Sequence, residues 1–379
     1  MVTSQQSTTM RNALIILYLI CISCMPLYAQ SLPDSIVSGP FPTGHIQGFA
    51  IDSRHQYVYY SYTTMLVKSD MQGHVIGTVK GLLGHLGCLD FNEADGRVYG
   101  SLEYKNDAIG KGILQMEQTD RTLDNAFYIA IFDVERIDRM DMDAERDGIM
   151  TTVYLPTVLD DYLAHVTIGT EIKEHRFGCS GIDGVSFGPM FGKQDGKQYL
   201  TVAYGIYGET DRPDNDYQVL LQYDIAKWKA YEHPLSQDHL HRQGPRKPNG
   251  RYFVWTGNTT YGVQNLEYDA HSHTWYMAVY KGQKTTFPNY SLFAIDGTSR
   301  PVSQSLKGIP YLKRGKVIPL KQEGLKDSST GIRGWHFPYG STGICALGDG
   351  QFYISENYQT PQGQGAVLRL YRHFPQEFK

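Results

Sequence analysis

The chain has little cysteine and no apolar run of membrane-spanning length beyond its N-terminal segment. Five of the 379 residues are cysteines, and Cys21 and Cys24 lie within that apolar segment. The other three, Cys88, Cys179 and Cys345, cannot all pair within the chain, which excludes a scaffold held together by disulfides. We expect them to be small buried thiols.

A strong charge of one sign and nucleotide-binding motifs are also lacking. The formal net charge is −4, which gives no electrostatic basis for binding nucleic acid or an anionic membrane surface. No long segment has a helical period, and no glycine-rich fingerprint joins a strand to a helix. The sequence therefore predicts neither a nucleic-acid partner nor a dinucleotide-binding domain.

The N-terminus has the pattern of a targeting segment. Arg11 precedes an apolar run over residues 13–28, which ends in Leu-Tyr-Ala-Gln. Its length is typical of a signal peptide and short for a membrane span. We expect residues 1–29 to be removed and residues 30–379 to form one exported domain, periplasmic or extracellular. Lipid attachment at Cys24 is the less favoured alternative, because the residues before it match a lipid-attachment signal poorly.

What the sequence does have is a strand motif repeated five times. Each copy is followed by a turn and by a second strand rich in aromatic and β-branched residues. The copies are His45–Asp52, His85–Asn92, Gly181–Phe187, Gly262–Asp269 and the degraded Gly340–Cys345. Third strands are expected at Met65–Ser69, Phe127–Val134, Val219–Asp224, Ser291–Asp296 and Val367–Tyr371. Fourth strands are expected at His74–Val79, Met150–Leu155, Lys229–Leu235 and Lys316–Leu320.

Units of four antiparallel strands resemble the blades of a β-propeller, in particular the irregular propellers of secreted bacterial proteins. The resemblance covers nearly the whole mature chain and implies an all-β ring of five blades. Six or seven blades stay open as alternatives, because Lys105–Asn125 and Pro156–Ser180 are long enough to hide irregular strands. The repeats lack the Gly-His and Trp-Asp pairs of the WD class and the Asp boxes of sialidases. No specific family is indicated, and no catalytic residue is carried over from one.

The last unit ends with three strands, and the first residues of the mature domain can supply a fourth. Asp34–Gly39 precedes the first repeat much as Val75–Lys80 precedes the second. An N-terminal strand that completes the last blade would close the ring and remove two sheet edges. We therefore expect Ile36 to pair with the C-terminal sheet.

The longest connections indicate which face of the ring carries function. In a four-stranded blade, the loops after the second and fourth strands open on one face. The long connections Lys105–Leu123, Gly205–Tyr217, Pro156–Ser180, Gln237–Tyr261 and Lys321–Tyr339 are all expected there, and Glu135–Gly148 is the exception. Loops of this length are usually functional or disordered. We interpret them as the walls of a pocket over the central channel.

Register then predicts which side chains face that pocket, at the starts of the first strands and the ends of the second strands. Titratable groups of both signs converge there with aromatic side chains, as a ligand pocket requires. Candidate catalytic residues are Glu103, Glu356, Asp183, His45 and His85. Candidate ligand-binding residues are Gln47, Gln264, Arg176, Tyr104, Tyr280, Lys281, Trp255, Trp335 and His336.

These residue types fit two acid–base chemistries. A glycosidase needs two carboxylates about 5 to 10 Å apart, and Glu103, Glu356 and Asp183 offer several pairs. A polysaccharide lyase needs a base, an acid and a cation for the substrate carboxylate. These could be supplied by His45 or His85, Tyr104 or Tyr280, and Arg176 or Lys281. For any one carboxylate, a structural salt bridge is the simpler interpretation.

No cofactor is assigned from the sequence. His45, His85 and Asp183 are candidate ligands for a divalent metal, but a repeated propeller histidine more often bonds a backbone carbonyl. We therefore expect an exported, monomeric propeller that acts on a carbohydrate or related polar small molecule by hydrolysis or elimination. The alternatives are a non-catalytic propeller that binds a glycan or an envelope protein, and a purely structural envelope component.

Overall fold

The computed structural model describes residues 31–52, 54–193, 196–257 and 259–375. It divides the chain into two compact units, Met1–Pro33 and Asp34–Lys379, and the description below concerns the second. The expected signal peptide, residues 1–29, lies outside the described residues. Within them, no helix is both long and apolar enough to cross a membrane.

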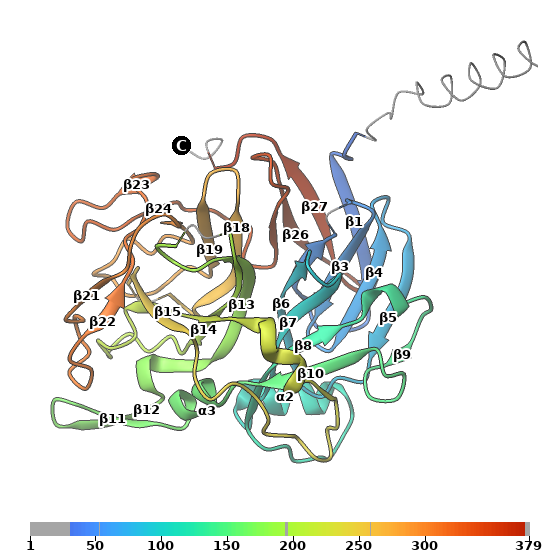
Figure 1. The fold of residues 1–379 in the computed structure, drawn as a ribbon, viewed down its shortest axis with the longest axis horizontal. Coiled ribbons are helices and arrows are strands. Elements are labelled where there is room, and N and C mark those ends of the chain that lie inside the picture. The colour runs from blue at the N-terminus through green and yellow to red at the C-terminus, as the bar shows by residue number, and fades with distance from the viewer. Residues whose placement is uncertain (1–30, 53, 194–195, 258, 376–379) are drawn as a thin grey trace, which may run out of the picture. The chain divides into compact units, whose positions relative to one another are not determined.

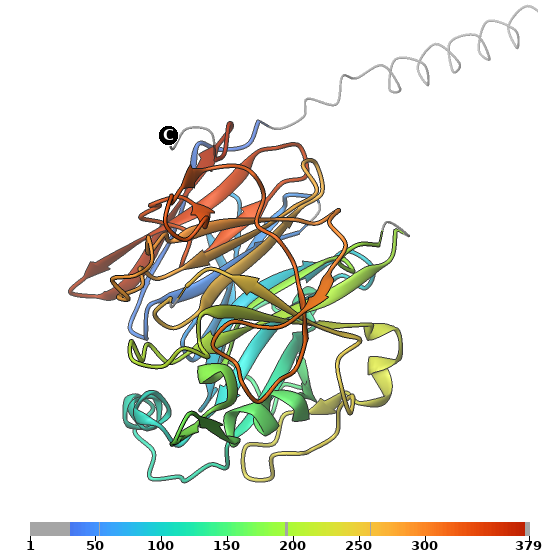
Figure 2. The same ribbon diagram turned by 90° about the vertical axis from the view of Figure 1, so that its left-hand side faces the viewer.

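Five mainly antiparallel sheets, two of them with one parallel pair near the outer edge, are arranged as the blades of a β-propeller (Figures 1 and 2), which confirms the expected all-β, five-bladed fold. Blade 1 contains β2 (Ile46–Ile51), β3 (Tyr57–Tyr62), β4 (Met65–Asp70), β5 (Val75–Lys80) and β9 (Met142–Asp143). Blade 2 contains β6 (His85–Asn92), β7 (Arg97–Tyr104), β8 (Ala126–Phe132), β10 (Met150–Tyr154) and β16 (His233–Pro234).

The other three blades follow along the chain. Blade 3 contains β13 (Cys179–Pro189), β14 (Gln198–Ile206), β15 (Tyr217–Tyr223), β17 (Gly250–Trp255), β22 (Gly315–Val317) and β21 (Val302–Gln304). Blade 4 contains β18 (Val263–Asp269), β19 (Thr274–Val279) and β20 (Leu292–Asp296). Blade 5 contains β25 (Ile344–Ala346), β26 (Phe352–Thr360), β27 (Gly363–Tyr371) and β1 (Ser35–Phe41).

The ring is closed by the N-terminal strand, as expected. Strand β1 pairs antiparallel with β27, with Ile36 opposite Leu368 and Val37 opposite Val367. Figure 1 shows β1 in blue beside the red strands β26 and β27. Ile36 is buried while Val37 faces solvent, so one side of the strand contributes to the core. The closure removes an exposed edge from both ends of the chain of blades.

Two of the expected fourth strands were wrong. In blade 3 the fourth strand is β17 and not Lys229–Leu235, where Ile225–Ala230 forms a 3₁₀ helix and His233–Pro234 pairs with β10 of blade 2. Proline has no N–H to donate, which suits such a short edge strand. In blade 4 the expected Lys316–Leu320 strand is divided, because β22 pairs with β17 and only Leu320 bridges Ile295.

The two long stretches that could have hidden another blade contain helices and a hairpin. Helix α2 (Ala108–Met116) begins after Asp107, whose side chain accepts a hydrogen bond from the Gly110 N–H as an N-cap. Helix α3 (Pro156–Tyr162) has proline in its first turn. The hairpin is formed by β11 (His165–Ile168) and β12 (Glu171–Glu174). Shorter elements are the 3₁₀ turns Val134–Arg136 and Arg176–Gly178 and the pair β23 (Leu325–Lys326) and β24 (Arg333–Gly334).

The repeated motif forms the innermost strand of each blade, and four of these strands contain a register shift near their start. Such bulges redirect side chains at the rims of barrels and next to sites. Gly48 shows why the motif needs small residues here, because a Cβ on it would lie 2.9 Å from the Cα of Cys88 in the next blade. The buried amide of Asn265 donates hydrogen bonds to the carbonyls of Gln47 and Ser341, which joins three blades at the channel.

The hydrophobic core lies between successive blades. One cluster includes Leu66 and Leu102 from blades 1 and 2, and another includes Ile129 and Val202 from blades 2 and 3. Further clusters continue through blades 3 to 5. The thiols of Cys88, Cys179 and Cys345 are free and buried, as expected. These clusters fill the interfaces from blade 1 through to blade 5.

Candidate functional site at the mouth of the channel

A pocket of about 310 Å³ lies where the inner strands of blades 1 to 4 begin. We call it the mouth pocket. Its walls combine two imidazoles, two carboxylates, an ammonium group, two amides and two phenols. The lining residues are His45, Gln47, Thr63, His85, Glu103, Lys105, Ile109, Ser180, Asp183, Tyr261, Gln264 and Tyr280.

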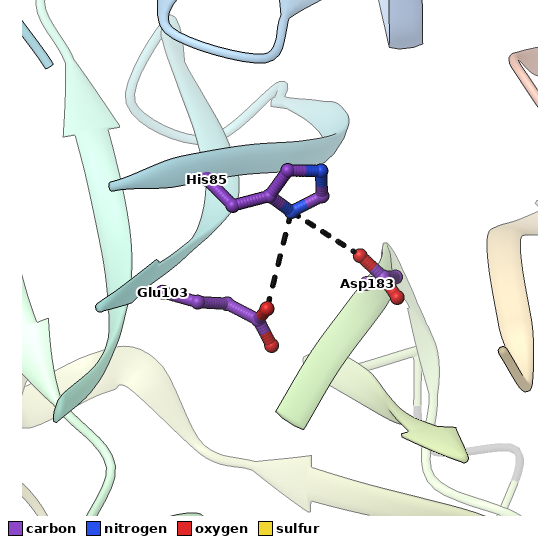
Figure 3. A group of neighbouring side chains, drawn as sticks. All are labelled: His85, Glu103 and Asp183. Carbon is purple, nitrogen blue, oxygen red and sulfur yellow. Dashed lines mark ion pairs between the residues drawn. The ribbon is translucent and has the colours of Figure 1, made fainter. Parts of the chain in front are cut away.

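The centre of the mouth pocket is formed by His85, Glu103 and Asp183 (Figure 3). His85 and Glu103 lie opposite each other on β6 and β7 of blade 2, and Asp183 comes from β13 of blade 3. The Nδ1 atom of His85 lies 3.6 Å from Asp183 Oδ1 and 3.9 Å from Glu103 Oε2. Both separations are too long for a hydrogen bond. Among the described residues, this buried nitrogen has no hydrogen-bond partner.

The carboxylate of Glu103 is held on both oxygens. Oε1 accepts a hydrogen bond from the Ile182 N–H, and Oε2 lies 2.8 Å from the Lys105 ammonium. Gly181 leaves room for this contact, because a Cβ at that position would collide with Glu103 Oε1. Its φ of 131° also lies in a region that favours glycine. The glycine of the repeated motif thus lets blade 3 approach a carboxylate of blade 2.

Lys105 brings one positive charge into a group of acids. Its ammonium lies 3.8 Å from Asp107 Oδ2 and donates a hydrogen bond to the Ser180 carbonyl. Burial opposes its charge, but Glu103, Asp107 and Asp183 together raise the pKa of Lys105 above its ordinary value. Lys105 is therefore protonated at neutral pH. With one ammonium among three carboxyl groups, the site has a net negative charge when all three carboxyl groups are ionised.

Burial is the largest influence on the pKa values of the two central acids, and their polar neighbours modify it. Burial raises the pKa of Glu103 to about 8, with Asp183 adding to the rise and Lys105 opposing it. Burial raises the pKa of Asp183 to about 6, against the influence of Lys105 and of the Gln264 amide. Burial lowers the pKa of His85 to about 3, and Lys105 and His45 lower it further. The imidazole of His85 is therefore neutral at pH 7, and its approaches to the carboxylates are not ion pairs.

The remaining wall residues surround Asp183 and the opening. Gln264 Nε2 donates hydrogen bonds to Asp183 Oδ2 at 3.1 Å and to the Tyr261 carbonyl at 3.0 Å. Tyr261 has a φ of 64°, a strained conformation of the kind that clusters at functional sites, and the residue is 47% exposed. The Tyr280 ring lies 5.9 Å from that of Tyr261. His45 is exposed toward the opening, yet the surrounding protein desolvates it enough to lower its pKa.

The structure thus brings together half of the residues that the sequence nominated. Seven line the mouth pocket: His45, Gln47, His85, Glu103, Asp183, Gln264 and Tyr280. The other seven lie elsewhere and make other contacts. The residues that line the pocket were the easier ones to predict, because most of them belong to the inner strands, whose register could be determined from the repeat.

Three of the nominated residues outside the pocket have polar partners of their own. Glu356 pairs with Arg369 on the neighbouring strand at 2.8 Å. Arg176 pairs with the buried Asp161 at 2.6 Å. The Tyr104 hydroxyl is buried against Gln237 at 3.0 Å, on the face of β7 opposite to Glu103. Each of these side chains has a structural explanation.

The other four are packing or surface residues. Trp335 is buried in the core of blades 4 and 5 and bridges Leu292. Trp255 packs edge-to-face against Tyr217 with ring centroids 4.8 Å apart. His336 is exposed beside Tyr290. Lys281 is exposed and does not line the mouth pocket.

Sequence reasoning also left pocket residues out of its candidate set: Thr63, Lys105, Ile109, Ser180 and Tyr261. Ser180 and Tyr261 stand immediately before repeat motifs, so the rule used for the strand starts could have included them. Ile109 belongs to helix α2, for which the sequence offered only the N-cap aspartate as a signal. Lys105 lies two residues beyond Glu103, on the same side of the chain.

A second pocket of about 500 Å³ lies at the opposite ends of the inner strands. It contains the buried carboxylate of Glu267 and the partly buried one of Asp90, neither of which forms an ion pair among the described residues. Burial raises the pKa of Asp90 to about 7 and raises that of Glu267 well above its ordinary value. Glu267 Oε1 accepts a hydrogen bond from the Ala346 N–H. We call this second pocket the lower pocket.

Comparison with known proteins gives no family for this chain. No protein-family model and no curated protein matches the chain. Among solved structures, the soluble aldose sugar dehydrogenase of Escherichia coli in its apo-form is 11% identical, with a TM-score of 0.36. That match covers 89% of this chain and 100% of the other. A Bacteroides caccae protein of unknown function is also 11% identical, with a TM-score of 0.27 and 73% and 87% of the two chains covered. The chain is a β-propeller, and likeness at this level says nothing about its chemistry.

Proposed function

We propose that the mouth pocket binds a carbohydrate or a related polar small molecule and acts on it by hydrolysis or elimination. The observation that carries this proposal is the meeting of His85, Glu103 and Asp183 inside one open pocket. Side chains of three types that transfer protons face the same space, and they come from two blades. Such convergence of polar groups in a concave, partly apolar site is the usual form of a small-molecule site.

The contacts favour different roles for the two carboxylates. Glu103 is 1% exposed and has both oxygens engaged, so it positions Lys105 and sets the local charge. Asp183 is 15% exposed, and its Oδ1 faces the pocket beside His85. Asp183 is therefore the group we assign as the acid or base that touches the ligand. His45 at the opening is the second candidate for proton transfer.

The walls fit a hydroxyl-rich ligand. The amides of Gln47 and Gln264 can donate and accept hydrogen bonds, as sugar hydroxyls require. The rings of Tyr261 and Tyr280 provide apolar faces with a polar end. The volume of about 310 Å³ is that of a small ligand or of one unit of a longer one.

Export is the second part of the proposal. Its support is the N-terminal sequence itself, in which Arg11 precedes the apolar residues 13–28. The protein would then act in the periplasm or outside the cell, with cleavage after Ala29. N-terminal sequencing of the protein recovered from the cell envelope or medium tests this, and the expected first residue is Gln30.

The experiment for the reaction is a screen of the purified protein against a glycan panel. It reads binding together with the release of reducing and unsaturated ends. We expect a hit whose turnover falls more than about a hundredfold in Asp183→Asn, since general acid–base groups contribute on that order. Asp138→Asn is the matched control, because Asp138 is an exposed carboxylate beside Arg139, far from this pocket in the chain. Full turnover in Asp183→Asn would contradict the assignment.

A non-catalytic glycan-binding propeller is the second candidate function. The observation in its favour is that both oxygens of Glu103 are already occupied, which is typical of a structural carboxylate. The same screen separates the two. Binding without release of reducing or unsaturated ends supports the binding propeller, and turnover of any glycan excludes it.

A further inference from the structure

The three side chains at the centre of the mouth pocket form a set of donor atoms with the geometry of a metal site. One atom each from His85, Glu103 and Asp183 lies within 4.8 Å of the other two. Two ligands at about 2.1 Å from a tetrahedral ion are about 3.4 Å apart. The separations of 3.6 and 3.9 Å from His85 Nδ1 are close to that value. A small rotation of either carboxylate would complete the arrangement.

A second, independent observation is the state of the imidazole. The Nδ1 atom of His85 is buried, faces two carboxylates and has no hydrogen-bond partner among the described residues. A buried polar nitrogen without a partner costs free energy unless a ligand satisfies it. A cation at this position would accept the lone pair of the neutral ring and would attract both carboxylates.

The charge of the surroundings points the same way. Glu103, Asp107 and Asp183 gather around a single ammonium, that of Lys105. When the three acids are ionised, the group carries two uncompensated negative charges, which a divalent ion would offset. The Lys105 ammonium lies 2.8 Å from Glu103 Oε2, so an ion would bind this oxygen from the side that faces His85 and Asp183. The positions between His85 and Asp183 stay open to the pocket.

We propose that His85 Nδ1, Glu103 Oε2 and Asp183 Oδ1 bind a divalent metal ion, with the ion's remaining positions open to the mouth pocket. One nitrogen and two oxygens suit Zn²⁺ or Mn²⁺ better than Ca²⁺ or Mg²⁺, which prefer all-oxygen sites. His45 faces the opening and contributes none of the three donor atoms. This proposal uses the pocket of the proposed function. With the ion bound, Asp183 would be a metal ligand, and proton transfer to the substrate would fall to His45, the second candidate at the opening.

The test is calorimetric titration of the purified full chain with MnCl₂ and, separately, ZnCl₂ after treatment with a chelator. We expect one ion per chain and a rise in Tm on its addition, since a ligand that binds only the folded state stabilises it. In His85→Ala and in Asp183→Asn the affinity should fall more than about tenfold, the least that loss of a supporting group costs. His74→Ala is the matched control, because His74 is an 81% exposed histidine paired with Asp70.

Circular dichroism shows whether each variant is folded, and His85→Gln replaces His85→Ala if the alanine variant is not. The proposal would be overturned if the native chain had no saturable site, or if His85→Gln and Asp183→Asn bound the ion as tightly as the native chain does. The two proposals fail separately. Metal binding without any glycan hit would support the metal site and leave the proposed reaction without support. Glycan turnover that survives full chelation would support the reaction and show that it does not need the ion.

Discussion

His85 Nδ1 lies 3.6 Å from Asp183 Oδ1 across the boundary between blades 2 and 3. Neither residue is near the other in sequence, and each stands near the start of an inner strand. The propeller brings them together because it places the starts of successive repeats around one channel, with His85 as the first residue of its repeat and Asp183 as the third of the next. The contact is neither a hydrogen bond nor an ion pair, since the separation is too long and the imidazole is neutral. It is an arrangement that a ligand would complete.

The buried pair of Lys105 and Glu103 gives the first prediction. Lys105→Met removes the cation that opposes the rise in the pKa of Glu103, so at pH 9 folding must either protonate Glu103 or bury its charge unpaired, and we expect the free energy of unfolding at pH 9 to fall by about 3–5 kcal/mol. The double variant Lys105→Met/Glu103→Gln removes the stranded charge and should recover most of that loss. Denaturant unfolding of both variants measures it. A double variant as unstable as the single one would show that the unpaired Glu103 charge is not the cause of the lost free energy of unfolding.

The lower pocket gives a prediction about pH. The folded pKa of Asp90 is about 7 and that of Glu267 is raised, so the neutral forms are favoured in the folded protein. This contribution to stability is fully present below the unfolded pKa values and is lost as pH rises through the folded ones. Glu267→Gln mimics the neutral acid and can still accept the Ala346 N–H bond. We expect it to have a higher Tm than the native protein at pH 8, with a smaller difference at pH 5.

Thermal unfolding of both proteins at the two pH values provides the check. Glu93→Gln, a change at another acid of the lower pocket, serves as the comparison. A Tm difference that is the same at pH 5 and pH 8 would mean that Glu267 does not titrate differently in the folded and unfolded states.

Ring closure gives the third prediction. Ile36→Ala removes a side chain that is 1% exposed in the strand completing blade 5, and should cost about 2–5 kcal/mol of unfolding free energy. Val37→Ala changes the next residue of the same strand, which is 48% exposed, and should cost about 0.5 kcal/mol. Chemical denaturation of the two variants compares them directly. Equal costs would indicate that β1 contributes little to the closed ring.

The ring itself could be predicted because its information is local and repeated. The repeat fixes the inner strand, and the alternation of side chains then fixes which residues face the channel, as for Gln47, Asp183 and Gln264. The same alternation would have excluded Tyr104, which follows Glu103 and must point to the other face of β7. The N-terminal closing strand was predictable because its sequence precedes the first repeat as β5 precedes the second.

The outer strands and much of the pocket wall could not be predicted in this way. The outer edge of blade 3 is completed by β22 and β21, far along the chain, and such pairing leaves no local pattern. Trp255 and Trp335 lie in segments where the repeat gives no register, so an aromatic that packs in the core looks the same as one that binds a ligand. Glu356 has the residue type of a catalytic group, but its partner Arg369 is identifiable only from strand pairing.

The account depends most on the claim that His85, Glu103 and Asp183 form a binding centre and do more than join two blades. The most direct measurement is an anomalous difference map from crystals of the protein soaked in MnCl₂. The account predicts one strong peak within about 2 Å of His85 Nδ1 and of one oxygen of Asp183. Peaks confined to surface carboxylates, with the three side chains unmoved and the space between them holding only water, would contradict it.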